Sequence, residues 1–308
     1  MAAIRIENLT KTYYSGWSGK ETTAVRALNV EVKEGEIFGF LGPNGAGKTT
    51  TIHILLNLIR PTGGAAYLFD CPVTESAVHR RLGYLPETVN LHDYYRGRAL
   101  LDFYAALAGL SPESRPARVT QLLKLLKLED AADKVVSRYS KGMAQRIGFA
   151  QALLNDPDLL ILDEPTSSLD PVGRKEFRDI LLELKRRGKT VFISSHILSE
   201  VETICDRVAI LQTGELRRAG TLSELSAGRS TLITVKSLPA NVLNALTPTA
   251  IQLTLVQGQA TIRCPDETLR QFVESLLQQN GVEIVRTEAE SQSLEEIFFS
   301  SIDTPSQP

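Results

Sequence analysis

Apolar strands and amphipathic helices alternate between residues 158 and 212. The strands are D-L-L-I-L-D at 158–163, T-V-F-I-S-S at 190–195 and R-V-A-I-L-Q at 207–212. The helices between them cover 172–187 and 197–206. Strands that are apolar throughout need cover on both faces, and helices that link successive strands make those strands parallel. This stretch therefore predicts an α/β fold with a mostly parallel core sheet.

Two further regions are expected beside that sheet. Residues 3–41 predict three strands, the first two joined by a Gly/Ser-rich hairpin loop at 14–21, which makes an antiparallel β subdomain. A helix is expected from Gly47 to about Ile59, where R-P-T-G-G ends it. Residues 98–154 have apolar residues at i, i+3 and i+4 spacing, so we expect a mainly helical insert.

The pattern changes after about residue 228 to short strands around short helices, which predicts a small C-terminal α+β domain. S-A-G-R-S is typical of a linker, so we place the boundary near 222–230. The expected domains are residues 1–225, with a helical subdomain at about 90–155, and residues 230–308. The C-terminal strands are expected at 231–235, 251–256, 260–264 and 282–287, with the longest helix at 267–279.

Composition favours an ordinary globular protein, with 43% hydrophobic and 23% charged residues. No run approaches the roughly 18 apolar residues that a membrane helix needs, and the N-terminus lacks the apolar core of a signal peptide. We therefore expect a soluble, cytoplasmic chain. Its three cysteines, Cys71, Cys205 and Cys264, form no C-x-x-C pair and are expected to be small core residues in a reducing compartment.

Charge argues against a nucleic-acid partner. The formal net charge is −2, and the residues from 231 onward contain 9 acidic and 4 basic side chains. Neither part of the chain carries the strong basic excess that proteins use to bind the phosphate backbone of nucleic acids.

A phosphate-binding loop is predicted at 42–50, where G-P-N-G-A-G-K-T-T matches the pattern G-x-x-x-x-G-K-[ST]. It follows a strand and opens a helix, whose N-terminus favours anions. Lys48 is expected to reach the β- and γ-phosphates, and the Thr49 hydroxyl to bind Mg²⁺. The candidate nucleotide-binding residues are Gly42, Pro43, Asn44, Gly45, Ala46, Gly47, Lys48, Thr49 and Thr50.

Two adjacent acids end the apolar strand L-L-I-L-D-E at 159–164. Ligands of open α/β sheets bind at the carboxyl ends of the strands. We therefore expect Asp163 to hold Mg²⁺ and Glu164 to orient and polarise the attacking water.

Y-S-K-G-M-A-Q-R at 139–146, ahead of L-L-I-L-D-E-P-T-S-S-L-D, resembles the ATP-binding cassette (ABC) ATPases. The usual signature of that family is L-S-G-G-Q, and here only the Ser and the second Gly are kept. Exporter-type relatives often carry S-K-G-M. The resemblance covers roughly residues 3–225 and implies a P-loop cassette that binds ATP and Mg²⁺.

The resemblance also implies a pair of cassettes with ATP between them. Ser140 and Gly142 would face the γ-phosphate held by a second subunit, and Asp170 lies in the loop that would cross the dimer. His196 matches the switch histidine that contacts the γ-phosphate. Tyr13 aligns with the aromatic residue that stacks on adenine, and Tyr14 and Trp17 are alternatives.

Glu87 departs from the family pattern. It follows Pro86 in R-L-G-Y-L-P-E-T-V-N, where relatives have a Gln whose oxygen approaches Mg²⁺. A carboxylate also suits Mg²⁺, so the expected metal ligands are Thr49, Asp163 and Glu87. The alternative is that Glu87 turns into solvent and water takes its place.

The resemblance favours the ATP-hydrolysing subunit of an exporter-type ABC transporter. Such a subunit works as a dimer, here expected to be a homodimer, on an integral-membrane permease at the cytoplasmic face of the cell membrane. One alternative is a soluble ABC ATPase that acts on a ribosome or a nucleic-acid complex. Another is a regulatory module that binds nucleotide without turnover.

Overall fold

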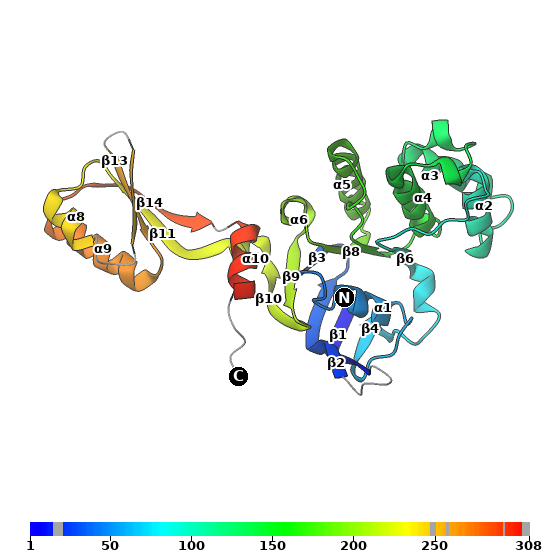
Figure 1. Ribbon diagram of the computed structural model, residues 1–308, viewed down its shortest axis with the longest axis horizontal. Helices are drawn as coiled ribbons and strands as arrows, with labels where there is room; N and C mark the ends of the chain where they lie inside the picture. Colours follow the sequence, from blue (N-terminus) through cyan, green and yellow to red (C-terminus); the bar gives the residue numbers. More distant parts are fainter. Residues whose placement is uncertain (15–20, 247–250, 257–258, 292, 304–308) are drawn as a thin grey trace. The chain divides into compact units, whose positions relative to one another are not determined.

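The chain forms two compact units, Met1–Thr221 and Leu222–Pro308. The first unit contains two β-sheets and the second contains one (Figure 1). Each unit has its own apolar core. The computed structural model describes residues 1–14, 21–246, 251–256, 259–291 and 293–303.

A six-stranded sheet is the centre of the first unit. Its order is β10-β9-β3-β8-β7-β6, and every neighbouring pair is parallel except β10 with β9. The predicted mostly parallel core sheet is therefore confirmed. Its strands are β3 (Ile37–Leu41), β6 (Leu82–Leu85), β7 (Leu159–Asp163), β8 (Thr190–Ser195), β9 (Arg207–Gln212) and β10 (Glu215–Thr221).

A second sheet of the same unit is antiparallel, with the order β2-β1-β4-β5. The sequence predicted its first two strands but missed the last two, which follow the turn at 60–64. The predicted hairpin loop lies mostly outside the described residues, because 15–20 are not among them. The strands are β1 (Ala2–Tyr14), β2 (Glu21–Lys33), β4 (Gly63–Leu68) and β5 (Cys71–Pro72).

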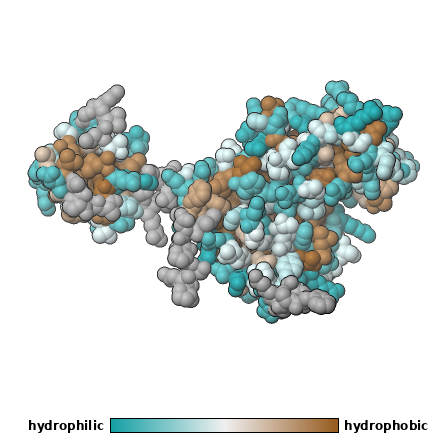
Figure 2. Space-filling model, viewed as in Figure 1, coloured by the Kyte–Doolittle hydropathy of each residue, from teal (hydrophilic) through white to brown (hydrophobic). Residues whose placement is uncertain are grey.

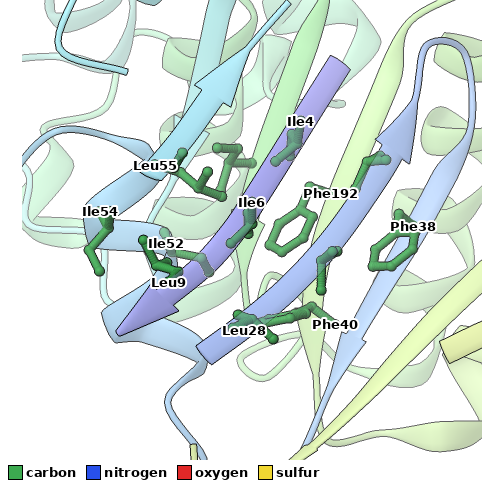
Figure 3. Packing of buried hydrophobic residues seen from close by; sticks show 14 of the residues in the cluster. Ile4, Ile6, Leu9, Leu28, Phe38, Phe40, Ile52, Ile54, Leu55 and Phe192 are labelled. Atoms are coloured by element: carbon green, nitrogen blue, oxygen red, sulfur yellow. The ribbon is translucent and has the colours of Figure 1, made fainter. Parts of the chain in front are cut away.

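One apolar cluster joins the two sheets and helix α1 (Lys48–Leu55), as Figure 3 shows. Phe38 on β3 and Phe192 on β8 have nearly parallel rings with centroids 6.0 Å apart. Ile4, Leu9 and Leu28 from the antiparallel sheet belong to the same cluster and are fully buried. Burial of each such side chain contributes about 1.5–3 kcal/mol to folding, so the cluster fixes the core sheet beneath the loop that begins α1.

Helix α1 ends at Leu55, so the prediction that it runs to about Ile59 is wrong. Asn57 adopts the left-handed backbone conformation, with φ of 55°. Asn tolerates this conformation better than most residues and commonly ends helices in it. The apolar residues beyond Leu55 therefore pack from a turn rather than from a helix.

The predicted helical insert contains α2 (Gly97–Leu107), α3 (Arg115–Leu125) and α4 (Lys141–Leu153). Gly148 of α4 lies so close to the chain after β6 that a Cβ there would be 2.8 Å from the Val89 side chain. The absence of a side chain at Gly148 thus lets α4 approach the loop that carries Glu87. Two helices of the core follow strands of the sheet, α5 (Pro171–Arg186) and α6 (Leu198–Ile204).

The second unit contains a β-α-β-β-α-β unit with the strand order β12-β13-β11-β14, which is the ferredoxin-like arrangement. All its neighbouring strands are antiparallel, and side chains of helices α8 and α9 join its core, among them Val242 and Val273. Its elements are α7 (Leu222–Ser226), β11 (Ala227–Val235), α8 (Ala240–Leu246), β12 (Gln252–Val256), β13 (Gln259–Cys264), α9 (Glu267–Gln279), β14 (Ile284–Ser291) and α10 (Leu294–Asp303).

Glu176 on α5 links the helical insert to the core of the first unit. Its carboxylate accepts hydrogen bonds from Lys127 Nζ at 2.8 Å and from Arg146 Nη2 at 2.7 Å. Both cations belong to the insert, and the Lys127 and Arg146 bonds hold the pKa of Glu176 below its usual range, with the Lys127 bond the larger cause. The charge of Glu176 therefore helps to hold α4 against α5.

We expect Glu176→Gln to lower the free energy of unfolding by about 0.5–1 kcal/mol at pH 7, because two charge-assisted bonds that water partly screens are weakened. The folded-state pKa is depressed, so this contribution is present above the unfolded pKa and is lost as pH falls through the folded pKa. Urea unfolding of the full chain, followed by circular dichroism at pH 7 and at acidic pH, measures it. The control is Asp179→Asn on the same helix, and an equal loss there would contradict the prediction.

Candidate active site

The loop between β3 and α1 packs tightly against neighbouring backbone, and the Lys48 side chain bonds across it. Gly47 has φ of 101° and precedes α1, and Lys48 Nζ donates to the carbonyl oxygen of Gly42 at 2.6 Å. A Cβ at Gly47 would lie 2.4 Å from the Ala24 carbonyl oxygen, and one at Gly42 would lie 2.6 Å from that of Leu211. Close backbone contacts therefore require glycine at both positions, and at Gly47 the positive φ requires it as well.

Two hydroxyl groups hold Asp163 at the end of β7. Thr49 Oγ1 donates to Asp163 Oδ2 at 3.1 Å, and Ser194 Oγ donates to Oδ1 at 2.5 Å. Thr49 and Asp163 thus bring two hard oxygen ligands together, which is the chemistry that Mg²⁺ prefers. The described residues contain no cluster of three or more His, Cys, Asp or Glu side chains suited to a metal ion. The protein oxygens fit a Mg²⁺ ion that also takes phosphate and water ligands.

Burial, and next the charge of Asp163, raise the pKa of Tyr84 on β6 to about 12. The hydroxyl therefore stays protonated at neutral pH. Neither Tyr84 nor Ser194 was among the predicted site residues. The two serines that end T-V-F-I-S-S at the carboxyl edge of the sheet were a usable signal for Ser194.

Glu164 lies between a histidine and a lysine. His196 Nδ1 is 2.7 Å from Glu164 Oε2, and Lys48 Nζ is 3.5 Å from Oε1. The carboxylate is buried, and its Oε1 atom has no hydrogen-bond partner within the chain. A carboxylate only accepts hydrogen bonds, so Nδ1 of His196 is the donor in this pair. Beyond its ion pair with Lys48, Oε1 receives no hydrogen bond from the chain, so it retains the capacity to accept one from a water molecule.

Most of the predicted nucleotide residues line one pocket of about 280 Å³. Glu87 is exposed and lines it, as do Glu164 and His196, and Ala24 joins them although the sequence gave no signal for it. The other lining residues are Pro43, Asn44, Gly45, Ala46, Gly47, Lys48, Thr49 and Thr50. The structure thus brings the residues predicted for phosphate binding and for hydrolysis together.

Ser140, Gly142 and Asp170 line a different pocket, of about 580 Å³, which shares no lining residue with the first. Ser140 Oγ accepts from Met143 N at 3.2 Å and caps α4. Asp170 Oδ1 accepts from Gly173 N at 2.8 Å and caps α5. The capping function of Asp170 was missed, although D-P at a helix start is a common signal for it.

Tyr13 lies on β1, is 42% exposed and is not among the residues that line either pocket. Lys11 Nζ lies 5.1 Å from the centroid of its ring. Tyr14 is exposed too, and Trp17 lies outside the described residues. The assignment of Tyr13 to adenine therefore stays a prediction.

The core sheet, the glycine loop and the paired acids define a P-loop nucleotide-binding protein. Residues 25–167 match the ABC transporter family. The ABC transporter ATP-binding protein YxlF of Bacillus subtilis is 35% identical over 97% of this chain and 99% of its own length. The fluoroquinolones export ATP-binding protein Rv2688c of Mycobacterium tuberculosis is 40% identical over 74% of this chain and 73% of its own.

Solved structures agree with these relatives. A dimeric ATP-binding cassette in a post-hydrolysis state, bound to ADP and Pi, matches with a TM-score of 0.65 and 27% identity. The match covers 71% of this chain and 98% of that one. The chain belongs to the ATP-binding proteins of ABC transporters, and it is accordingly an ATPase. The fold class and the family resemblance are confirmed, while the functions of individual site residues stay predictions.

We expect Gly47→Ala to unfold more easily than Gly45→Ala in the nucleotide-free chain. Both glycines have positive φ, so both substitutions cost backbone strain. Only at Gly47 would the added Cβ meet a backbone oxygen, since nothing lies within 4 Å of a Cβ at Gly45. The extra loss should be about 1–3 kcal/mol, measured by urea unfolding. Equal losses in the two variants would contradict it.

Proposed function

We propose that this chain is the ATP-hydrolysing subunit of an ABC transporter that drives a separate integral-membrane permease, in the direction of export. The observation that carries the proposal is the pocket that holds the phosphate loop, Glu164 and His196 together, in a chain whose relatives include an exporter subunit. The chain would lie at the cytoplasmic face of the membrane through its permease. None of the described helices has the length and apolar character to cross a bilayer.

In this proposal the residues of the first pocket divide the work of hydrolysis. Backbone N–H groups of the loop and Lys48 bind the β- and γ-phosphates. Mg²⁺, when bound to Thr49 and Asp163, would offset the negative charge of the phosphate oxygens. Glu164 Oε1 accepts a hydrogen bond from the attacking water and orients it. His196 holds Glu164 through Nδ1, which leaves its Nε2 for the γ-phosphate when that nitrogen is protonated.

The second pocket supports the proposed pairing of two chains. Ser140 caps the helix whose first residue is Lys141, so backbone N–H groups and a cation face the same opening. An anion held by one chain would fit there. Each chain would thus supply its phosphate loop to one ATP and its Ser140 pocket to the other, which favours a homodimer around two ATP.

An aromatic cluster near Glu87 supports a docking surface for the permease. Tyr95 and Phe103 have stacked rings with centroids 5.7 Å apart, and His92 lies within 6.3 Å of both. Tyr94 beside them is 95% exposed. Figure 2 shows a mostly hydrophilic surface on the face it displays, with hydrophobic residues in separate groups. Large exposed aromatic residues on such a surface favour binding of another protein.

We expect Glu164→Gln to bind ATP but to lose at least about 100-fold in turnover, because the amide is a poor proton acceptor. Turnover is measured as phosphate release.

A tagged Glu164→Gln chain, purified with ATP from detergent-solubilised native membranes, should co-purify with a polytopic membrane protein, which mass spectrometry identifies. Lys48→Ala, which should not hold ATP, is the matched control. Ribosomal proteins or nucleic acid with no membrane protein would replace the proposal by the soluble ATPase alternative.

We expect Glu87→Gln to keep ATP hydrolysis, because the amide oxygen still suits Mg²⁺ or water. Glu87→Ala should weaken the stimulation of hydrolysis by the reconstituted permease more than it weakens basal hydrolysis. Phosphate release by the chain alone and by the complex in vesicles gives both rates. Full stimulation in the Ala variant would mean that Glu87 does not take part in coupling.

A further inference from the structure

Two segments of the first unit meet at the Glu164–His196 pair. One is the turn from Glu164 to Asp170, and the other runs from His196 through α6. A second contact joins the same two segments, since Thr166 Oγ1 donates to Glu200 Oε2 at 2.5 Å. Thr166 is 6% exposed and the side chain of Glu200 is 21% exposed, so this bond is shielded from water.

Arg174 adds a third member to this contact. Its Nε atom donates to the carbonyl oxygen of Leu169 at 3.1 Å and lies 3.5 Å from Glu200 Oε1. Arg174 is in the first turn of α5, directly after the Glu164–Asp170 turn. Glu200 therefore holds the turn at its third residue, Thr166, through a hydroxyl group and near its far end through the guanidinium group of Arg174.

The opposite face of α6 is fixed on the core sheet. A Cβ at Gly39 on β3 would lie 2.9 Å from Val201 Cγ1 and 3.1 Å from Cys205 Sγ, so the helix approaches the strand closely. Val201 is fully buried. Because this face of α6 is held against β3, the distance from α6 to the Glu164–Asp170 turn depends on the contacts that α6 makes on its side facing the turn.

On that other side the space between α5 and α6 is incompletely filled. A cavity of about 190 Å³ has Phe177, Leu181, Ile193 and Ile204 in its lining, and Thr166, Arg174 and Glu200 line it as well. The two helices are neighbours (Figure 1), and the cavity leaves part of the space between their side chains unfilled. The polar contacts of Glu200 with Thr166 and Arg174 lie at this cavity.

We propose that Glu200 is a positioning residue for ATP hydrolysis, which holds the Glu164–Asp170 turn and α6 at the spacing where His196 Nδ1 meets Glu164 Oε2. The proposal rests on the functions proposed above for Glu164 and His196. Glu164 is two residues from Thr166, and His196 is four residues from Glu200. Loss of the Thr166–Glu200 bond should therefore also change the contact between Glu164 and His196. The carboxylate acts through the pair and does not itself contact the phosphates.

The first test observes His196 directly, in the full nucleotide-free chain. The chain has four histidines, so the nitrogen NMR signals of its imidazole rings are few, and His196→Gln assigns the one of interest. Glu200→Ala and Thr166→Val should each shift the His196 Nδ1 signal. Thr166→Ser and Glu200→Gln should leave the His196 Nδ1 signal close to that of the unsubstituted chain, because a hydroxyl donor and an oxygen acceptor are kept. Glu202→Gln, an exposed acid on the same helix, is the control and should leave it unchanged.

The second test is kinetic. Glu200→Ala should lower kcat by about 10- to 100-fold and change KM for ATP by less than about 2-fold, because positioning is lost while the phosphate loop is intact. In the double variant, Thr166→Val should add little to the loss of kcat that Glu200→Ala causes alone. Both substitutions remove the same Thr166–Glu200 hydrogen bond. If neither kcat nor the His196 signal moves in folded Glu200→Ala and Thr166→Val, the proposal is overturned. If Glu164→Gln and His196→Gln keep full turnover, the functions proposed for the pair fail, whereas the NMR result still reports on Glu200.

Discussion

The register of three parallel strands brings together the phosphate loop, the paired acids and His196. On β3 and β8, Leu41 pairs with Ser195, and on β7 and β8, Asp163 pairs with Ser194. Because the strands run in the same direction, the segments that leave their carboxyl ends begin at one edge of the sheet. The phosphate loop therefore lies beside the paired acids and His196, although more than 100 residues separate it from them in sequence. A slip of one residue in any strand would move its functional side chain to the other face.

Glu164 has a strained backbone conformation, and the contacts around it have to offset the free energy of that strain. Its φ is 46°, a left-handed conformation that is unfavourable for a residue with a side chain by about 1–3 kcal/mol. Its backbone N–H bonds both Ser194 Oγ and the Ser194 carbonyl oxygen, which fixes the turn on β8. His196 and Lys48 then hold the carboxylate from two sides. These contacts together offset the backbone strain and hold the Glu164 carboxylate at the pocket.

Much of this arrangement is predictable from sequence. The remainder is not predictable, because it depends on single backbone angles and on contacts between distant segments. Strand–helix alternation and the glycine loop are local signals, and they correctly predicted the core sheet and the loop that lines the pocket. The end of α1 depends on one backbone angle at Asn57, which its apolar neighbours do not reveal. Ala24 lines the pocket and its backbone carbonyl oxygen lies beside Gly47, a tertiary contact that no local sequence pattern marks. Glu200 looks like any charged helix residue until Thr166 and Arg174 are seen beside it.

The two pockets differ in charge in a way that makes the proposed pairing depend on ATP. The first holds Lys48 with Glu87 and Glu164, and the second holds three cations, Lys127, Lys141 and Arg146, with two acids. Without nucleotide, neither pocket has a strong excess charge to attract the other. Bound ATP places several negative charges in the first pocket, and the helix N-terminus and cations of a second chain then stabilise them. A ligand shifts a two-state equilibrium only through its preference for one state. Loss of the γ-phosphate removes much of that preference, so hydrolysis itself would release the pair.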